Sequence, residues 1–309
     1  MAGKGGVGKT TVSATLARAA ALSGLSTLIV EVEGKSGLPG MFAHGELGYD
    51  EVVLSAGGGP DGAADVRART LTADAALLEY LQDHGLSRIS RRLVSSGALD
   101  VVATAAPGIK DILLLGKVKQ LERAGVADLI VLDAPAAGHA ITFLQSPRSL
   151  LDTVSVGPIN AQARDVLELL EDHRRCQVVL VTIPEETPVN EAVETAFSLE
   201  DRVGVGLGPI VVNGVYPALV GLDADPVAAA EAAGVSLRPG EADALVAAAT
   251  FRRSRVELQD EQVGRLESAL PLPQLRLPFQ FTTDIGPAEL ETLAGALLDE
   301  IDSLSELPA

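Results

Sequence analysis

The chain opens with Met1-Ala-Gly-Lys-Gly-Gly-Val-Gly-Lys-Thr-Thr11. Within this stretch Gly3, Gly8, Lys9 and Thr10 occupy the fixed positions of the phosphate-loop pattern G-x-x-x-x-G-K-[ST]. In such a loop the glycines let successive backbone N–H groups turn towards a polyphosphate, the lysine reaches its β- and γ-phosphates, and the hydroxyl binds Mg²⁺. The residues that follow place apolar side chains at helical spacing, so the phosphates would lie at a helix N-terminus. We therefore expect the loop to bind a nucleotide through these residues: Gly3, Gly5, Gly6, Val7, Gly8, Lys9, Thr10 and Thr11.

The composition favours a core of small aliphatic side chains. Of the 309 residues, 47% are hydrophobic but only 3% are aromatic, and there is no tryptophan. Ala, Val and Leu must therefore fill the core, which suits parallel strands covered by helices. The length alone allows one large domain or two ordinary ones. Because no internal repeat or low-complexity linker divides the chain, we expect a single domain over residues 1–309.

An insert is expected within this domain over about residues 45–98, as a surface subdomain with a hairpin and helices. Two apolar runs between Asp50 and Thr72 flank a turn-rich glycine segment, which predicts a β-hairpin. A helical stretch is predicted from Ala75 through Arg92. In the C-terminal third, residues 226–235 and 241–269 are expected to be helices that cover the sheet.

The net charge and the cysteine content limit the partners. A formal net charge of −18 argues against nucleic-acid binding, which needs a basic surface, and against direct attachment to anionic lipid. Cys176 is the only cysteine, so no intrachain disulfide can form and the cytoplasm is the expected location, either free or peripheral to a membrane. A Cys₄ zinc clasp across a twofold dimer is excluded, because each chain would have to supply two cysteines. No secretory signal precedes the phosphate loop, and no apolar run approaches the roughly 20 residues that span a bilayer.

The start of the chain is abrupt. Only Met1 and Ala2 precede Gly3, whereas a phosphate loop normally follows a buried strand. We expect that the start is trimmed and that the incomplete central strand costs some stability. A central strand that is itself truncated is the alternative.

A second lysine, Lys4, lies inside the loop and gives Lys4-Gly-Gly-Val-Gly-Lys9. This resembles the deviant phosphate loop of the family that holds the arsenite-pump ATPases, the tail-anchored-protein targeting ATPases, MinD/ParA and the nitrogenase iron protein. The resemblance implies a three-layer α/β/α fold with a parallel sheet, ATP and Mg²⁺ as ligands, and a dimeric ATPase in which Lys4 reaches the nucleotide of the partner subunit. It is closest to a bacterial, anion-transporter-like branch of the arsenite-pump and targeting ATPases. Members of that branch resemble one another as paired paralogues, so a homodimer and a heterodimer are both open.

Two carboxylates at a strand end are candidates for the chemistry. Residues Ser26–Val32 predict a short apolar strand that leads to Glu33 and then to a glycine-studded loop. In the arsenite-pump and targeting ATPases an aspartate at this point, in switch I, activates the attacking water, and the resemblance gives that role to Glu33. Glu31 is the competing carboxylate, one pleat earlier on the same side of the strand. Lys9 and Lys4 would neutralise the charge that develops during phosphoryl transfer.

A second apolar run, Asp128–Asp133, predicts a buried parallel strand that ends in a carboxylate. Asp133 fits a Walker B acid, which holds Mg²⁺ directly or through water, and the Thr10 hydroxyl is the second metal-binding group. The residues after the strand, Asp133-Ala-Pro-Ala-Ala-Gly-His139, resemble the family's switch II. Gly138 would allow this loop to approach the γ-phosphate, so we assign it to the nucleotide site.

The adenine end is predicted at two later strand ends. Asn213 closes a short strand, and in the resembling ATPases an asparagine at this point reads adenine with both the donor and the acceptor of its amide. A simple turn asparagine before Gly214 is the alternative. Pro278 and Phe279 stand where the family places a loop against the adenine, so we assign them to the nucleotide as well.

The residues and the resemblance together favour a dimeric ATP-hydrolysing switch that couples Mg-ATP binding and hydrolysis to a membrane-transport or client-delivery partner. The alternatives are a tail-anchored-protein chaperone and a MinD/ParA-like switch or scaffold at a membrane surface. Only Met1 and Met41 could supply adaptable methionine surface, which counts against the chaperone, and the missing basic amphipathic tail counts against the membrane scaffold. A membrane-protein partner and a hydrophobic client both stay open beside the second subunit. Driving a metalloid pump through thiolates is disfavoured because Cys176 stands alone.

Overall fold

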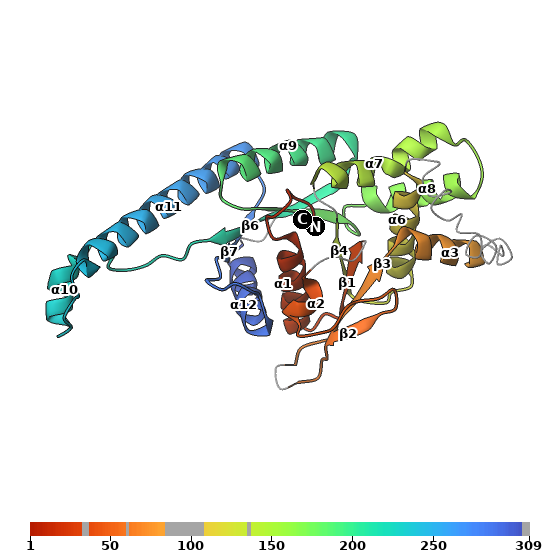
Figure 1. Ribbon diagram of the computed structural model, residues 1–309. Coiled ribbons are helices and arrows are strands. Elements are labelled where there is room, and N and C mark those ends of the chain that lie inside the picture. Colours follow the sequence, from red (N-terminus) through yellow and green to blue (C-terminus); the bar gives the residue numbers. More distant parts are fainter. Residues whose placement is uncertain (33–36, 60–61, 84–107, 135–136, 305–309) are drawn as a thin grey trace.

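The strands form two sheets, which lie side by side in the molecule (Figure 1). The structure, a computed structural model, describes residues 1–32, 37–59, 62–83, 108–134 and 137–304. One sheet has the strand order β2-β3-β1-β4 and the other the order β5-β6-β7. The bounds of the strands are β1 (Thr27–Val32), β2 (Val52–Ser55), β3 (Val66–Leu71), β4 (Leu129–Asp133), β5 (Gln177–Thr182), β6 (Gly206–Val215) and β7 (Gln274–Pro278).

Parallel pairing dominates both sheets, as predicted. β1 pairs in parallel with β3 and with β4, and β6 pairs in parallel with β5 and with β7. β2 is antiparallel to β3, so the hairpin predicted between Asp50 and Thr72 is confirmed. Because parallel strands share one direction, the ends of β1 and β4 meet at one edge of the sheet, with Glu31 in register with Asp133.

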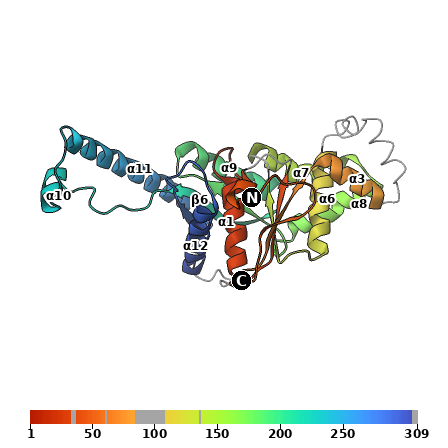
Figure 2. The ribbon, with the colours of Figure 1, turned by 60° about the horizontal axis from the view of Figure 1, so that its bottom comes forward.

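Helices cover both faces of the sheets and complete a three-layer arrangement. α1, α2 and α12 pack on one face, where α1 and α12 lie side by side (Figure 2), and α6, α7, α8 and α9 pack on the other. The core between the layers is built mainly from Ala, Val and Leu, which matches the composition. The bounds of the helices are α1 (Lys9–Leu22), α2 (Leu38–Met41), α3 (Ala73–Asp83), α6 (Ile109–Arg123), α7 (Ala137–Thr153), α8 (Pro158–Glu171), α9 (Glu186–Arg202), α10 (Pro226–Ala232), α11 (Glu241–Ala269) and α12 (Pro287–Ser303).

A short seam of backbone hydrogen bonds links the two sheets. Ala2 is buried and pairs in parallel with β5: its N–H donates to the Val179 carbonyl oxygen at 3.0 Å, and its own carbonyl oxygen accepts from Val181 N at 2.8 Å. The α-amino group of Met1 donates to the carbonyl oxygen of Leu132 in β4 at 2.7 Å. Burial lowers the pKa of this amino group, because the charged form loses its hydration. The run before the phosphate loop therefore lies between β4 and β5 and holds the loop at the junction of the sheets.

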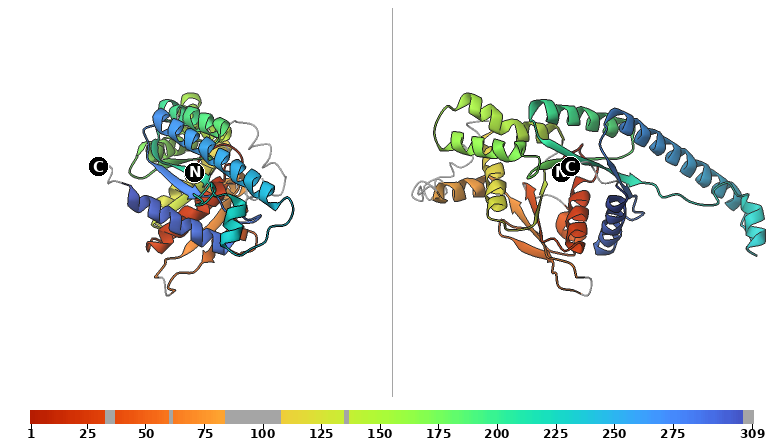
Figure 3. Two further views of the ribbon diagram at one scale, coloured as in Figure 1. Left: turned by 90° about the vertical axis from the view of Figure 1, so that its left-hand side faces the viewer. Right: turned by 180° about the vertical axis from the view of Figure 1, so that it is seen from behind.

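The helices of the C-terminal third depart from the prediction. Residues 226–235 and 241–269 were expected to cover the sheet, but α10 and the first part of α11 project away from the body (Figures 1 and 3). α10 contains no buried residue, and the buried residues of α11 begin at Arg252. The expectation was wrong for this segment. Apolar residues lie on several faces of α11, and a helical pattern without one apolar face does not indicate which side of the helix packs on a sheet.

Part of the insert expected over residues 45–98 lies outside the described residues. Within the described part, β2, β3 and α3 belong to it, and the continuation of the predicted helix from Asp83 to Arg92 is not among the described residues. The single-domain assignment stays a prediction. Among the described helices, none is long and apolar enough to cross a membrane.

Candidate functional site

The phosphate loop is pressed against the ends of two strands on one side and is open on the other. A Cβ atom on Gly3 would come within 2.2 Å of the Val181 carbonyl oxygen, and one on Gly8 within 2.3 Å of Asn213 Nδ2. Gly8 also has a left-handed φ of 87°, which residues other than glycine rarely adopt. By contrast, a Cβ on Gly5 would meet no atom within 4 Å. The packed side fixes the loop, and the open side leaves its backbone accessible to a ligand.

The helix start that follows the loop fits an anion. α1 begins at Lys9, its N-cap residue Gly8 provides no side-chain hydrogen bond, and its first turn has no acidic residue. The N–H groups of a first helical turn have no intrahelical acceptor, and together they carry a partial positive charge. A polyphosphate would supply both acceptors and negative charge at this point.

Lys9 is the second feature that fits a polyphosphate. Its Nζ donates to the carbonyl oxygen of Lys4 at 3.0 Å, so the side chain lies back over the loop. Burial lowers the pKa of the Lys9 ammonium from 10.5, and the nearby Asp133 carboxylate opposes this effect only in part. A phosphate group beside Lys9 would supply a negative charge that compensates the ammonium group for the hydration it loses on burial.

A hydroxyl and carboxylate cluster lies beneath the loop. Thr10 Oγ1 donates to Asp133 Oδ2 at 2.7 Å, and Ser13 Oγ donates to Asp133 Oδ1 at 3.4 Å. Asp133 is 7% exposed and closes β4. Oxygen ligands of this kind suit Mg²⁺, which is bound by one or two protein groups together with phosphates and waters. Thr10 and Asp133 therefore lie together as predicted and could hold the metal, and Ser13 is an addition that the sequence did not reveal.

Glu31 is a buried carboxylate on the strand next to Asp133. It is 4% exposed and accepts a hydrogen bond from Thr70 Oγ1 at 2.8 Å. Its register with Asp133 places both side chains on the same face of the sheet, towards α1. In the sequence, Glu31 is recognisable as a candidate because it is the only charged residue within the apolar run Thr27–Val32. Glu33, the carboxylate favoured from the sequence, lies outside the described residues.

Lys4 points away from its own loop. Its Nζ forms an ion pair with Glu191 Oε1 on α9 at 2.6 Å, and the two side chains are 35% and 39% exposed. Ion pairs this exposed contribute at most about 1 kcal/mol, so the contact can be exchanged at small cost. The loop side chain that is unique to the deviant pattern is therefore presented at the surface.

The residues assigned to the adenine end gather at the ends of β6 and β7. Asn213 Nδ2 donates to the carbonyl oxygen of Val7 at 2.9 Å, which joins this strand end to the phosphate loop. Pro278 pairs with Val215, and Phe279 N donates to the Val215 carbonyl oxygen at 2.8 Å. Phe279 is 39% exposed, and its ring packs against Tyr216 and Phe281 with centroid distances of 5.1 Å and 4.8 Å, so a base could stack only on the part of the ring that these neighbours leave exposed.

Gly138 is less closely connected to the rest of the predicted site. It is exposed in the first turn of α7, and its neighbours at positions 135 and 136 are not described. Among the described hydrogen bonds of the loop, none reaches Gly138, so its assignment stays a prediction. The candidate site as a whole combines a loop that fits an anion, an oxygen cluster that fits a metal ion, and an amide with an aromatic ring at the ends of β6 and β7.

The sequence is similar to those of several known proteins. Residues 1–159 match the family described as anion-transporting ATPase. ATPase BagA of Mycobacterium tuberculosis is 32% identical over 295 residues, which cover 89% of this chain and 85% of the relative. The arsenical pump-driving ATPase of Escherichia coli is 28% identical over 238 residues, covering 70% of this chain and 39% of the relative. ATPase GET3B of Arabidopsis thaliana is 23% identical over 262 residues, covering 70% and 64%.

Proposed function

Because the chain belongs to the anion-transporting ATPase family and is an ATP-hydrolysing enzyme, we propose that it works as a dimeric switch, in which Mg-ATP binding and hydrolysis are coupled to a partner protein. The observation that carries the proposal is the position of Lys4. Its ammonium group lies on the α9 surface with Glu191, whereas Lys9 lies over the loop. A second subunit that approaches the loop would therefore meet Lys4 at the contact surface.

Each residue has a separate task in the proposed reaction. Bound Mg-ATP would supply a γ-phosphate activated towards attack by water. Lys9 would bind the β- and γ-phosphates, Thr10 and Asp133 would hold the metal, and the partner's Lys4 would neutralise charge as it develops. Glu33 would orient the water and accept its proton, with Glu31 as the alternative base.

A cavity whose lining includes no residue of the phosphate loop is a second candidate contact site for a ligand. A cavity of about 340 Å³ lies between α3, α6 and α8. Its lining includes two ion pairs, Lys117–Glu79 at 2.5 Å and Lys119–Asp165 at 2.7 Å, together with Arg123. Ala76, Leu113, Pro158 and Ala161 also belong to the lining, so the cavity combines apolar walls with charged groups and suits a ligand of mixed polarity.

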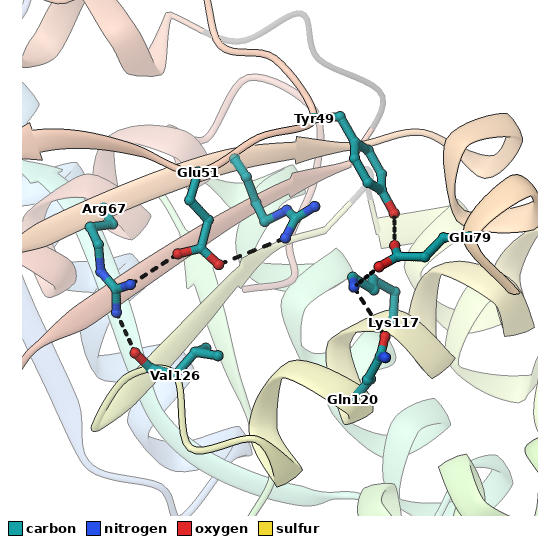
Figure 4. Close-up of polar contacts among 8 residues, drawn as sticks. Tyr49, Glu51, Arg67, Glu79, Lys117, Gln120 and Val126 are labelled. Atoms are coloured by element: carbon teal, nitrogen blue, oxygen red, sulfur yellow. Dashed lines mark hydrogen bonds and ion pairs between the residues drawn. The ribbon is translucent and has the colours of Figure 1, made fainter. Parts of the chain in front are cut away.

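Figure 4 shows two groups of polar contacts, one among Tyr49, Glu79 and Lys117 and the other around Arg67 of β3. Tyr49 donates to Glu79, and Lys117 bridges Glu79 and Gln120. The same view shows Arg67 between Glu51 and the Val126 carbonyl oxygen. Because these groups satisfy one another, the side chains of each group are held in place without a ligand.

The cysteine does not suit metalloid capture. Burial raises the pKa of the Cys176 thiol, so the thiolate that binds soft metalloids is disfavoured. The chain contains one cysteine, and a cluster of thiolates cannot form within it. We therefore propose a cytoplasmic ATPase that needs Mg²⁺ and acts on a partner other than a thiolate-bound metalloid.

Complementation between subunits tests the proposal. Lys9→Ala and Lys4→Ala should each abolish or strongly reduce ATP hydrolysis as single variants, whereas Lys110→Ala, an exposed lysine at the start of α6, should retain it. In an equimolar mixture of the first two variants, half of the dimers are mixed, and each mixed dimer has one intact site made of Lys9 from one subunit and Lys4 from the other. The mixture should recover about one quarter of the wild-type rate. A mixture as inactive as its components would show that Lys4 acts within its own chain, and persistent turnover by Lys9→Ala would place the ATP site elsewhere.

A further inference from the structure

The cavity between α3, α6 and α8 is large enough for a small molecule. Its volume of about 340 Å³ lies near the lower end of the range of about 300–1,000 Å³ that is typical of ligand pockets. Each helix supplies a charged side chain to it: Glu79 comes from α3, Lys117 from α6 and Asp165 from α8. Because the phosphate loop contributes nothing to the described lining, a ligand in this cavity would be additional to the nucleotide.

The charged side chains of the lining leave one positive charge unbalanced. Three cations, Lys117, Lys119 and Arg123, line the same space as two carboxylates, Glu79 and Asp165. Each lysine forms an ion pair with one carboxylate, whereas no carboxylate among the described residues forms an ion pair with Arg123. This positive excess contrasts with the formal net charge of −18 of the whole chain, and it favours a ligand with a single negative charge.

The wall on the α3 side is formed before any ligand binds. Lys117 Nζ donates to Glu79 Oε1 at 2.5 Å and to Gln120 Oε1 at 3.0 Å, and Tyr49 donates to the second carboxylate oxygen of Glu79 (Figure 4). Burial raises the pKa of the Glu79 carboxyl, but the hydrogen bonds from Lys117 and Tyr49 outweigh this effect and hold the pKa below its usual value. Glu79 is therefore a carboxylate that is already paired, and it leaves the other cations of the lining to the ligand.

Lys119 and Arg123 are the cations that suit an anion. Lys119 is 9% exposed, and its ammonium group has three N–H donors but only one carboxylate partner among the described residues, Asp165 at 2.7 Å. Arg123 follows Lys119 by four residues, so both side chains lie on one face of α6. Like charges at this spacing repel each other. An anion between Lys119 and Arg123 would remove this repulsion and accept hydrogen bonds from both.

Apolar groups from all three helices line the remaining walls. They are Ala76, Leu113, Pro158 and Ala161. Gly116 allows α6 and α8 to lie close together at this point, since a Cβ atom there would come within 1.8 Å of Gln162 Nε2. The Gln162 side chain lies over Gly116 and donates to the Ile112 carbonyl oxygen at 3.4 Å. A ligand that fills the cavity therefore needs an apolar body beside its charged group.

We propose that this cavity binds a small organic acid with one carboxylate and an apolar body. The carboxylate accepts from the guanidinium group of Arg123 and the ammonium group of Lys119, and the apolar body lies against Ala76 and Ala161. A carboxylate fits better than a phosphate monoester for two reasons. Its single charge balances the positive excess of the lining, and its two oxygens match the planar fork of a guanidinium group. This binding goes beyond the proposed function and does not depend on ATP hydrolysis.

Titration calorimetry of the full-length, nucleotide-free protein with sodium octanoate tests the proposal. One octanoate should bind per chain with a dissociation constant of about 0.1–1 mM, as expected for a ligand of this size. Octylammonium has the same length and the opposite charge, so it should bind at least about 10-fold more weakly. Inorganic phosphate lacks an apolar body and should not displace octanoate.

Variants of Arg123 assign the binding to this cavity. Arg123→Gln should raise the dissociation constant of octanoate by about 10–100-fold, because it removes a charged, two-pronged hydrogen bond. Arg123→Lys should have a smaller effect, since it keeps the charge but loses the fork. Arg174→Gln is the matched control, because Arg174 is exposed but does not line the cavity. An unchanged circular dichroism spectrum would show that each variant is folded.

Filling the cavity is an independent test. Ala161→Phe places a ring in the space of the apolar body and should also weaken octanoate binding by at least about 10-fold. Ala288→Phe, at an exposed position of α12, is its control. A wild type that does not bind octanoate, equal binding of octylammonium, displacement by phosphate, or full affinity in Arg123→Gln or Ala161→Phe would each overturn the proposal. None of these results would affect the proposed function, which depends on hydrolysis and on the mixed Lys4 and Lys9 variants.

Discussion

The two sheets contribute groups of different chemistry to the proposed nucleotide site. The first sheet brings buried carboxylates, Glu31 on β1 and Asp133 on β4. The second sheet brings a neutral amide, Asn213 on β6, and the partly exposed Phe279 ring after β7. The loop between them joins both, because Thr10 bonds to the first sheet and the Val7 carbonyl oxygen to the second.

This difference suggests a division of labour. Carboxylates hold metal ions and accept protons, whereas an amide and an aromatic ring recognise a base by hydrogen bonding and stacking. Changes at the first sheet should therefore alter hydrolysis, and changes at the second should alter the affinity for the nucleotide. Each prediction below tests whether this division holds.

The largest effect is expected beside the first sheet. Glu33→Gln should leave ATP bound while lowering the hydrolysis rate by about 10²–10⁴-fold, the range for a lost general base. Glu31→Gln should lower it by only about 10–100-fold, as for a residue that positions a neighbouring ligand. Single-turnover assays with pre-bound ATP measure both, with the exposed Glu46→Gln as the control. If Glu31→Gln proves to be the slower enzyme, the role of general base moves to Glu31.

A moderate effect is expected at the second sheet. Asn213→Ala should raise the dissociation constant of ATP by about 5–30-fold, because it removes the hydrogen bond to Val7 and a contact to the base. The rate of hydrolysis from saturated enzyme should change much less. Isothermal titration with ATP and with GTP distinguishes two roles of the amide. A loss confined to ATP supports base recognition, whereas an equal loss for both nucleotides means that Asn213 acts only by holding the loop.

The smallest effect is a proton taken up at the loop between the sheets. Burial lowers the pKa of Lys9 in the folded protein below 10.5, the value in the unfolded chain. Between these two pKa values the unfolded chain binds more protons than the nucleotide-free folded protein, so the free energy of unfolding rises with pH in this window. Bound phosphates should raise this pKa again. ATP binding in that alkaline window should then take up less than one proton per site.

Calorimetry in buffers of different ionisation enthalpy measures this uptake. Lys9→Ala should show none under conditions where it still binds ATP, and Lys110→Ala should match the wild type. Uptake that persists without Lys9 would assign the proton to another group.

The sequence predicted the parts of the site that follow from a local pattern. Lys9 and Thr10 are fixed by the loop spacing, and Asp133 is found because an apolar run ends in a carboxylate. The contact of Asn213 with Val7 was not predicted, since the two residues are 206 positions apart and meet only through the strand order. The position of Glu31 beside Asp133 depends on the register of β1 and β4, which the sequence does not specify.

The projecting segment, α10 and the first part of α11, shows where such prediction fails. The sequence predicted both helices correctly, because α10 and α11 lie within the expected ranges 226–235 and 241–269. What it did not predict was the surface on which they pack. Both helices are rich in alanine, which stabilises a helix whether it is buried or exposed. Helix propensity alone therefore could not distinguish a helix that covers the sheet from one that projects into solvent.

The apolar core has a consequence for how the molecule unfolds. One cluster of buried side chains includes residues of β1 and β3 in the first sheet and of β5 and β6 in the second, and the hydrogen bonds of Met1 and Ala2 join β4 to β5. The two sheets are therefore expected to unfold as one cooperative unit. A ligand on the loop would contact groups beside both sheets, and its binding free energy would stabilise the whole unit against unfolding.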